Sequence, residues 1–183
     1  MNAESPTFDF QPTLNDDTVT LRSLSNEDFE SLYAVAADPA IWAQHPVRNR
    51  HDLAVFQSFF DESLNSGGAL VVIDNATGEV IGSSRFHGYD QTKREVEIGW
   101  SFLARSHWGG AYNKQMKQLM LEHAFRFVDQ VVFPIAIGNI RSQRAIEKIG
   151  AIKSENRPDA GGNPSFVYRI DADSYDLCKT SST

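Results

Sequence analysis

The chain has 183 residues, 41% hydrophobic and 11% aromatic, which fits one globular domain and disfavours a disordered chain. Its formal net charge of −7 argues against a dedicated nucleic-acid-binding protein. A single cysteine excludes an internal disulfide. No apolar run approaches the ~20 residues that span a membrane, and the first residues do not resemble a secretory signal. We therefore expect a cytoplasmic protein without a membrane partner.

The first third of the chain predicts an arm, a strand and two helices. Residues 1–17 are polar and contain two prolines, which favours a loose N-terminal arm. Residues 19–24 alternate in polarity as a half-buried strand does. A helix capped by Ser25 follows and ends at Pro39, and residues 39–50 are expected to form a loop. The apolar stripe of the second helix consists of Leu53, Phe56, Phe60 and Leu64.

The middle of the chain predicts a meander of three strands separated by polar turns. These strands cover residues 69–73, 80–87 and 95–102. The third strand alternates most cleanly, so its two faces can be assigned. We expect one face to carry Val96, Ile98, Trp100 and Phe102. We expect the other face to carry Glu95, Glu97, Gly99 and Ser101.

The last third of the chain predicts helices and strands in alternation. From residue 110 onward, the expected elements are helix 110–128, strand 131–137, helix 139–149, strand 151–155 and strand 166–170. The whole order indicates an α+β fold on one central sheet. We expect this single domain over residues 18–172 and a C-terminal tail over residues 173–183.

The turn that begins the long helix is the strongest local signal for a binding site. Gly109, Gly110 and Ala111 keep side chains away from the backbone where several amide N–H groups have no helical acceptor. Such an end carries roughly half a positive charge and suits a phosphate, although a tight turn without a ligand would use the same residues. The charge pattern favours an anion, because residues 105–148 carry seven basic and three acidic side chains, whereas residues 1–104 carry six and sixteen.

Two motifs in the chain resemble the GNAT superfamily of acetyl-CoA-dependent N-acetyltransferases, and most of all its branch that acetylates ribosomal-protein N-termini. The first motif is Trp108-Gly109-Gly110-Ala111-Tyr112. The second runs from Asn139 to Gly150, with Ser142 three residues after the asparagine and Glu147-Lys148-Ile149 near its end. The resemblance covers residues 19 to about 170.

The chain departs from the family pattern at two positions. Ser106 stands where the first motif has Gln or Arg, with Arg105 one residue earlier. Ile146 stands where many members have a tyrosine that protonates the leaving thiolate, so a tyrosine acid is absent from that position.

The resemblance implies a fold and a co-substrate. The sheet would be mostly antiparallel, with about six or seven strands, about four flanking helices, and a splayed V between the fourth strand (95–103) and the fifth (131–137). A bulge is expected near Ser101 and Phe102. The co-substrate is acetyl-CoA, and no metal is expected, because the five histidines lack metal-binding spacing. The expected cofactor-binding residues are Phe102, Leu103, Ala104, Arg105, Trp108, Gly109, Gly110, Ala111, Tyr112, Asn113, Asn139, Ser142 and Lys148. Further candidates for the phosphates are Lys114, Arg141 and Arg144.

The resemblance also suggests which residues perform the chemistry. Amine acetylation needs a base for the amine and a group that stabilises the leaving thiolate. Glu97 is the candidate base or the head of a water relay, with Glu95 as the fallback, and Ser142 is the candidate for the thiolate. A surface glutamate and a helix-start hydroxyl are the alternatives. The candidate substrate-binding residues are Tyr33, Trp42, His45 and His87.

The sequence therefore predicts an N-acetyltransferase that moves an acetyl group to a primary amine by direct attack on the thioester. The acceptor would be a protein N-terminus or a small-molecule amine, and the acidic first half favours a cationic one. The alternative is a non-catalytic acetyl-CoA-binding module of the same fold. A nucleotide-binding protein of another class is disfavoured, because neither phosphate-loop nor dinucleotide-binding glycine motifs are found. We expect a monomer or a homodimer without a nucleic-acid partner.

Overall fold

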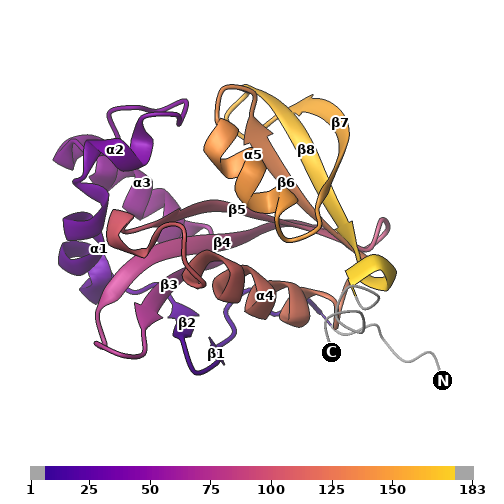
Figure 1. Ribbon diagram of the computed structural model, residues 1–183, viewed down its shortest axis with the longest axis horizontal. Coiled ribbons are helices and arrows are strands. Elements are labelled where there is room, and N and C mark those ends of the chain that lie inside the picture. The colour runs from indigo at the N-terminus through magenta and orange to yellow at the C-terminus, as the bar shows by residue number, and fades with distance from the viewer. Residues whose placement is uncertain (1–6, 176–183) are drawn as a thin grey trace.

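Eight strands form one sheet in the order β1-β2-β3-β4-β5-β6-β8-β7 (Figure 1). The computed structural model describes residues 7–175. Neighbouring strands are antiparallel, except for the parallel pair β5 and β6. The strands are β1 Leu14–Asn15, β2 Val19–Ser23, β3 Ala69–Asp74, β4 Val80–Asp90, β5 Glu95–Leu103, β6 Gln130–Ala136, β7 Ile152–Pro158 and β8 Pro164–Asp171. The predicted α+β class and mostly antiparallel sheet are confirmed, with a short extra strand at the edge.

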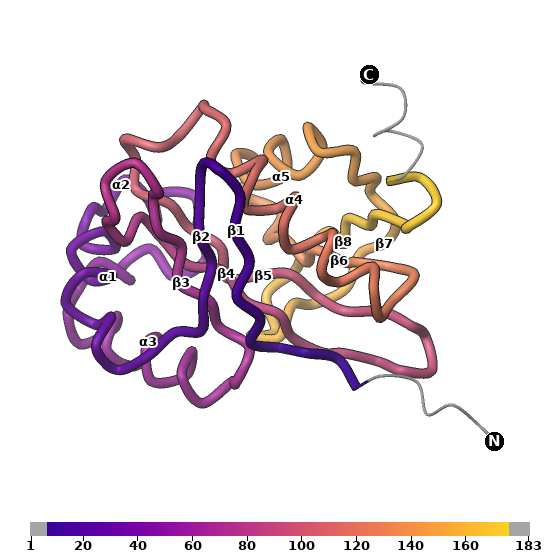
Figure 2. Tube along the Cα trace, turned by 90° about the horizontal axis from the view of Figure 1, so that it is seen from below, coloured from indigo at the N-terminus to yellow at the C-terminus, as the bar shows by residue number. Residues whose placement is uncertain are grey.

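The helices lie at both sides of the two central strands. They are α1 Phe29–Ala36, α2 Pro39–Trp42, α3 Leu53–Asn65, α4 Tyr112–Ala124 and α5 Ile140–Glu147, with 3-10 turns at Asn26–Asp28 and Arg105–His107. Figures 1 and 2 agree that α1, α2 and α3 gather at one side, while α5 and β6 to β8 lie at the other. The strands β4 and β5 run between these two groups.

Two apolar cores cover the two faces of the sheet. One core packs α4, including Met116 and Met120, against the sheet face that carries Leu70. The other packs Phe56 and other residues of α1 to α3 against the face that carries Val71. Neighbouring residues of β3 thus enter different cores, as the twofold period of a strand requires. Both faces of the sheet are therefore fixed by burial.

The predicted loop over residues 39–50 begins with a helix. The side chain of Asp38 accepts a hydrogen bond from the backbone N–H of Ala40 at 3.0 Å, and Pro39 occupies the first helical turn of α2. As a sequence pattern, Asp38-Pro39 was interpreted only as the end of the preceding helix. The same pair is also a strong helix start, because proline needs no N–H acceptor there and its φ suits a helix.

The described part of the predicted loose arm is packed against the domain. Phe8 is 3% exposed, and its ring contacts that of Phe86 with centroids 5.2 Å apart. The backbone carbonyl of Asp9 accepts a hydrogen bond from Nε2 of His123 at 2.7 Å. The apolar side chains of this otherwise polar segment account for the difference. Residues 1–6 of the arm and residues 176–183 of the predicted tail, with Cys178, lie outside the described residues.

A bulge in β5 changes which way its side chains face. Ser84 of β4 lies opposite both Trp100 and Ser101, and Trp100 has a φ of +51°. The extra residue reverses the alternation that follows it. As a result, Ile98 enters the α4 core while Phe102 enters the other core, so the expectation that both share a face is wrong. The bulge lies one residue earlier than the predicted position.

The long helix is shorter than predicted, and one apolar stripe is shifted. The helix α4 ends at Ala124, and the apolar spacing continues through a turn that still buries Val128. In α3, Leu53 is exposed and Phe59 is buried in its place. Within residues 7–175, no helix combines the length and the apolar character needed to cross a bilayer.

Candidate functional site

The strands β5 and β6 diverge and leave a cleft between them. Their parallel pairing covers only three residue pairs and ends where Glu97 meets Val132. Beyond that point, residues 98–103 of β5 and 133–136 of β6 form no strand pairing with each other, and a cleft of about 640 Å³ lies there. The predicted V is therefore present. Six of the predicted site residues line the cleft: Trp42, His45, Glu97, Asn113, Asn139 and Ser142.

Glu97 presents a carboxylate to the cleft without a partner. Within residues 7–175 that carboxylate forms no hydrogen bond or ion pair, and Arg157 and Arg85 act on it only through space. Burial raises the pKa of Glu97 to about 7, with Asp159 adding to the rise and Arg157 opposing it. A carboxyl group that titrates near neutral pH can accept a proton there. By contrast, the fallback Glu95 lies 3.7 Å from Arg157 in an ion pair.

The N-terminus of α4 has the bare backbone that the sequence predicts. Gly109 has a φ of +74°, which favours glycine, and Ala111 provides no side-chain cap. The first N–H with a helical acceptor is that of Gln115, which bonds to the carbonyl of Ala111. Tyr112 does not face the cleft, because its hydroxyl donates to the carboxylate of Asp74 at 3.4 Å. The helix end is therefore open to an anion.

The N-terminus of α5 borders the opposite wall of the cleft. Asn139 is its N-cap, and Oδ1 accepts a hydrogen bond from the backbone N–H of Ser142 at 3.3 Å. Asn139 therefore caps α5 in addition to lining the cleft. The hydroxyl of Ser142 has no hydrogen-bond partner within the described part of the chain. That hydroxyl is therefore available to a ligand.

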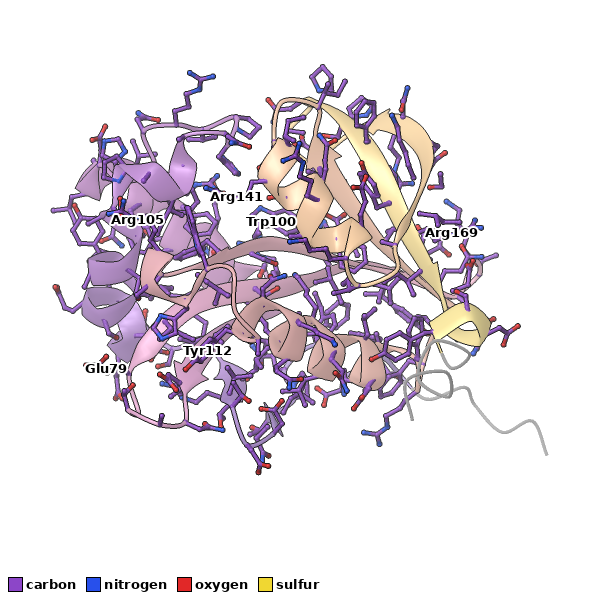
Figure 3. All side chains as sticks on the ribbon, in the orientation of Figure 1. Glu79, Trp100, Arg105, Tyr112, Arg141 and Arg169 are labelled. Atoms are coloured by element: carbon purple, nitrogen blue, oxygen red, sulfur yellow. The ribbon has the colours of Figure 1, made fainter. Side chains whose placement is uncertain are left out.

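Most of the basic residues proposed for phosphates are occupied or distant. Arg105 forms an ion pair with Asp38 at 2.8 Å. Arg141 lies between α2 and α5 (Figure 3), where its Nη2 donates to the carbonyl of Ile41 at 2.6 Å and its guanidinium stacks on Trp108 at 4.1 Å. Lys148 is the C-cap of α5, Lys114 and Arg144 are exposed, and none of the three lines the cleft.

The remaining predicted residues do not line the cleft. Tyr33 and His87 do not line the cleft: the hydroxyl of Tyr33 donates to the carbonyl of His51 at 3.2 Å, and His87 is exposed beside Trp100. The ring of Phe102 packs in the core of α1 to α3. The carbonyl of Leu103 accepts a hydrogen bond from Nε1 of Trp108 at 2.9 Å, and the N–H of Ala104 donates to Ile81 at 2.7 Å.

The sequence interpretation missed a buried lysine at the cleft. Lys117 of α4 is 2% exposed and lines the cleft. Its Nζ donates to the hydroxyl of Ser101, and to that of Ser84 at 3.3 Å. Burial lowers the pKa of Lys117 to about 7. Its position three residues before Met120 places it on the buried stripe of the helix, which is the signal that could have identified it.

Two arginines at the cleft were also missed. Arg50 and Arg85 line the same cleft as Glu97. Arg85 follows the apolar residues of β4 without any local sequence signal, and Arg50 ends a segment expected to be a loop. Among the described residues, no group of three or more His, Cys, Asp or Glu side chains could hold a metal ion.

The family of the protein follows from comparison with known proteins. The family model for the acetyltransferase (GNAT) domain matches residues 18–152, so the chain belongs to the GNAT acetyltransferases, a family of acyltransferases. No curated protein matches the chain significantly.

Solved structures share the fold at low sequence identity. A GCN5-related N-acetyltransferase from Brucella melitensis is 18% identical, with a TM-score of 0.77 over 94% of this chain and 82% of that one. RimJ of Mycobacterium smegmatis, in complex with CoA-disulfide, is 17% identical, with a TM-score of 0.65 over 89% and 87%. A spermidine N-acetyltransferase from Vibrio cholerae, in complex with CoA and spermine, is 16% identical, with a TM-score of 0.65 over 87% and 99%. These identities establish the fold alone.

Proposed function

We propose that the protein transfers the acetyl group of acetyl-CoA to a primary amine in the cleft between β5 and β6. The observation that carries this proposal is the carboxyl group of Glu97. It lies where the two strands separate, it has no ion-pair partner within residues 7–175, and burial brings its pKa to about 7. A base with this pKa takes a proton from an ammonium group most effectively near neutral pH.

The proposed place for acetyl-CoA uses the backbone that strands and helices leave free. The pantetheine arm would lie along β5 beyond Glu97, where β6 no longer pairs with it. The diphosphate would accept hydrogen bonds from the N–H groups before Gln115 at the start of α4. Asn139 and Ser142 would contact the arm from α5. The printed descriptions of RimJ and of the spermidine N-acetyltransferase both include bound CoA or a CoA derivative, which supports this co-substrate.

In the proposed reaction, Glu97 accepts a proton from the ammonium group of the acceptor, directly or through water. The nitrogen lone pair then attacks the thioester carbonyl carbon, the new C–N bond forms and the C–S bond breaks. The nitrogen loses its second proton in this step, which balances the proton gained by the leaving thiolate. Ser142, whose hydroxyl is free within the described chain, would donate a hydrogen bond or a proton to the leaving thiolate. This role would replace the tyrosine that many family members have at the position of Ile146.

The acceptor is proposed as a protein N-terminus or a small-molecule amine. Similarity to RimJ at 17% identity supports the ribosomal-protein branch only weakly, so that branch stays a prediction. Spermidine is the substrate named for the Vibrio cholerae enzyme, and we include polyamines among the acceptors to test for this chain.

The experiment that tests the proposal has two stages. Calorimetry on the purified full chain first measures the affinity for acetyl-CoA and CoA. A panel of amino acids, peptides, polyamines and amino sugars is then incubated with acetyl-CoA, and free thiol and product mass are measured. Thiol release that depends on an amine, with a mass increase of one acetyl group, supports the proposal. Binding without turnover on any amine would favour the non-catalytic module, and no binding would overturn both.

A further inference from the structure

The part of the cleft formed by the α2–α3 segment, α3 and β4 holds two oriented guanidinium groups. Arg85 of β4 is 5% exposed, its guanidinium stacks on the ring of Trp100 at 4.4 Å, and Nη2 donates to the hydroxyl of Ser63 at 2.6 Å. The guanidinium of Arg50 stacks on the ring of Phe59 at 4.3 Å. Stacking on an aromatic face fixes the plane of a guanidinium and leaves its edge for hydrogen bonding. In Arg50, Nη1 donates to Nε2 of His45 at 3.2 Å, so the remaining edge is what a ligand can use.

Neither guanidinium is neutralised by a carboxylate of the described residues. No Asp or Glu oxygen in residues 7–175 lies within 4.0 Å of Arg50 or Arg85. Nε of each arginine is buried and has no hydrogen-bond partner. Burial lowers the pKa of both groups to about 10, so both stay charged at neutral pH. Glu62 acts on both charges and Glu97 on that of Arg85, but no carboxylate contacts either guanidinium. A desolvated cation without a direct anionic partner is costly, which points to an anionic ligand.

The acidic surplus of the first half of the chain is not at the cleft. Of the fifteen acidic residues among the described residues 7–104, only Glu62 and Glu97 line it, and Asp159 from the turn after β7 is a third acid there. Glu62 is exposed on α3, although its charge raises the pKa of both arginines. The pKa of Glu97 is about 7, so this residue carries a full negative charge only above neutral pH. The net charge of residues 1–104 therefore does not describe the charge of the cleft. The acidic surplus of this segment no longer supports a cationic acceptor.

Arg85 lies next to the candidate base, and the charge of Arg85 in turn acts on Arg50. Arg85 pairs with Gly99 across β4 and β5, and the side chain of Glu97 lies against Gly99. An anionic group held by Arg85 would therefore leave an amine on the same small molecule close to Glu97. The cleft of about 640 Å³ must also hold the acyl end of the co-substrate, so only the amine end of the acceptor and the group bound by the arginines need fit inside it.

We infer that Arg50 and Arg85 bind a carboxylate of the acceptor, so that the substrate is a small amine that also carries a carboxylate group, as an α-amino acid does. This inference rests on the proposed function. The planar edge of a guanidinium matches a carboxylate with two parallel hydrogen bonds, and two such groups at one place make a selective site.

The test compares acceptors that differ only in this group. Each α-amino acid is assayed beside its carboxamide with acetyl-CoA, using thiol release. We expect kcat/KM to be roughly 10- to 100-fold higher for the carboxylate member of a productive pair, the range of a charge-assisted hydrogen bond. Arg50→Gln and Arg85→Gln should raise KM for the amino acid and remove most of the preference. Arg48→Gln, an exposed arginine of the same segment that does not line the cleft, is the matched control.

A second measurement separates the inference from the proposed function. Binding of an N-acetyl amino acid and of its amide, as product analogues, is measured by calorimetry without turnover. Preference for the carboxylate in the native chain, lost in Arg50→Gln, supports the inference even if the base is wrongly assigned. If Arg85→Gln does not fold, Arg85→Lys replaces it in the binding test. Lysine keeps the charge but lacks the planar edge, so a weaker preference for the carboxylate is expected. Equal binding of both analogues, or turnover only of polyamines and carboxamides, would overturn the inference and leave the acetyltransferase proposal standing.

Discussion

The side chain of Glu97 lies so close to Gly99 that a Cβ atom at position 99 would be 3.1 Å from Oε1 of the glutamate. A methyl group at this distance forces the carboxylate to shift by a few tenths of an ångström. We predict that Gly99→Ala lowers kcat several-fold, less than the ~10²-fold that a 1 Å misplacement can cause. Steady-state kinetics with acetyl-CoA measure the effect. Gly138→Ala, where no atom lies within 4 Å of the added Cβ, is the control, and an equal loss there would contradict the explanation.

The titration of Glu97 should appear in the pH profile of the enzyme. Because burial raises the pKa of this group to about 7, the carboxylate that accepts a proton is lost as pH falls through 7. We predict that kcat/KM rises with pH to a plateau above that value. Glu97→Gln should lower the rate by about 10²–10⁴-fold, the contribution of a general base. The competing variant is Glu95→Gln: if it removes the acidic limb and Glu97→Gln keeps it, the base is Glu95.

Ser142 has two candidate roles: its hydroxyl stabilises the leaving thiolate, or it stabilises the start of α5. The backbone N–H of this residue is already bonded to Asn139, whereas its hydroxyl has no partner within residues 7–175. We predict that Ser142→Ala lowers kcat and changes the free energy of unfolding by less than about 0.5 kcal/mol. Urea denaturation and kinetics on the same samples measure both. A loss of stability with full activity would return Ser142 to a structural role at the start of α5.

The buried amine of Lys117 should make stability depend on pH in a defined direction. Burial lowers its pKa from 10.5 to about 7, so between these values the unfolded state binds more protons and wild-type stability rises with pH. We predict that Lys117→Met raises the free energy of unfolding by about 1–3 kcal/mol at pH 6 and that this gain shrinks toward pH 10. Ser84 and Ser101 are also bonded to each other at 2.7 Å, so we expect neither hydroxyl to lose its only partner in the variant. Urea denaturation of both proteins at several pH values measures this difference. A gain in the free energy of unfolding that does not vary with pH would contradict the proposed titration of Lys117.

Local patterns predicted most of the elements, because each element is governed by its neighbours in the sequence. The strands at β3 to β6 and the two motifs at α4 and α5 lie within a few residues of their predicted positions. The N-cap hydrogen bond of Asn139 is also local, since its Oδ1 accepts from the backbone N–H three residues later. The helix start at Asp38 and Pro39 was misjudged because the same two residues can end one helix and begin the next.

The features that the sequence did not predict depend on contacts between distant segments. The bulge at Trp100 is visible only against Ser84 of the neighbouring strand, and it reverses the faces that simple alternation assigns. Arg85 contacts Ser63 of α3 and the ring of Trp100, and no spacing within one segment indicates these contacts. The net charge of the first 104 residues did not predict the charge of the cleft, because only two of the fifteen acidic side chains in residues 7–104 line it.

Pairing between β5 and β6 covers three residues and ends at Glu97. One side chain thus marks both the junction of the two halves of the sheet and the position of the candidate base. A substitution that widens the gap between the halves would also displace the group that accepts the proton. Substitutions in α3 and in the segment before it should therefore change the range of acceptors with the least effect on the candidate base. Both border the cleft but take no part in this junction.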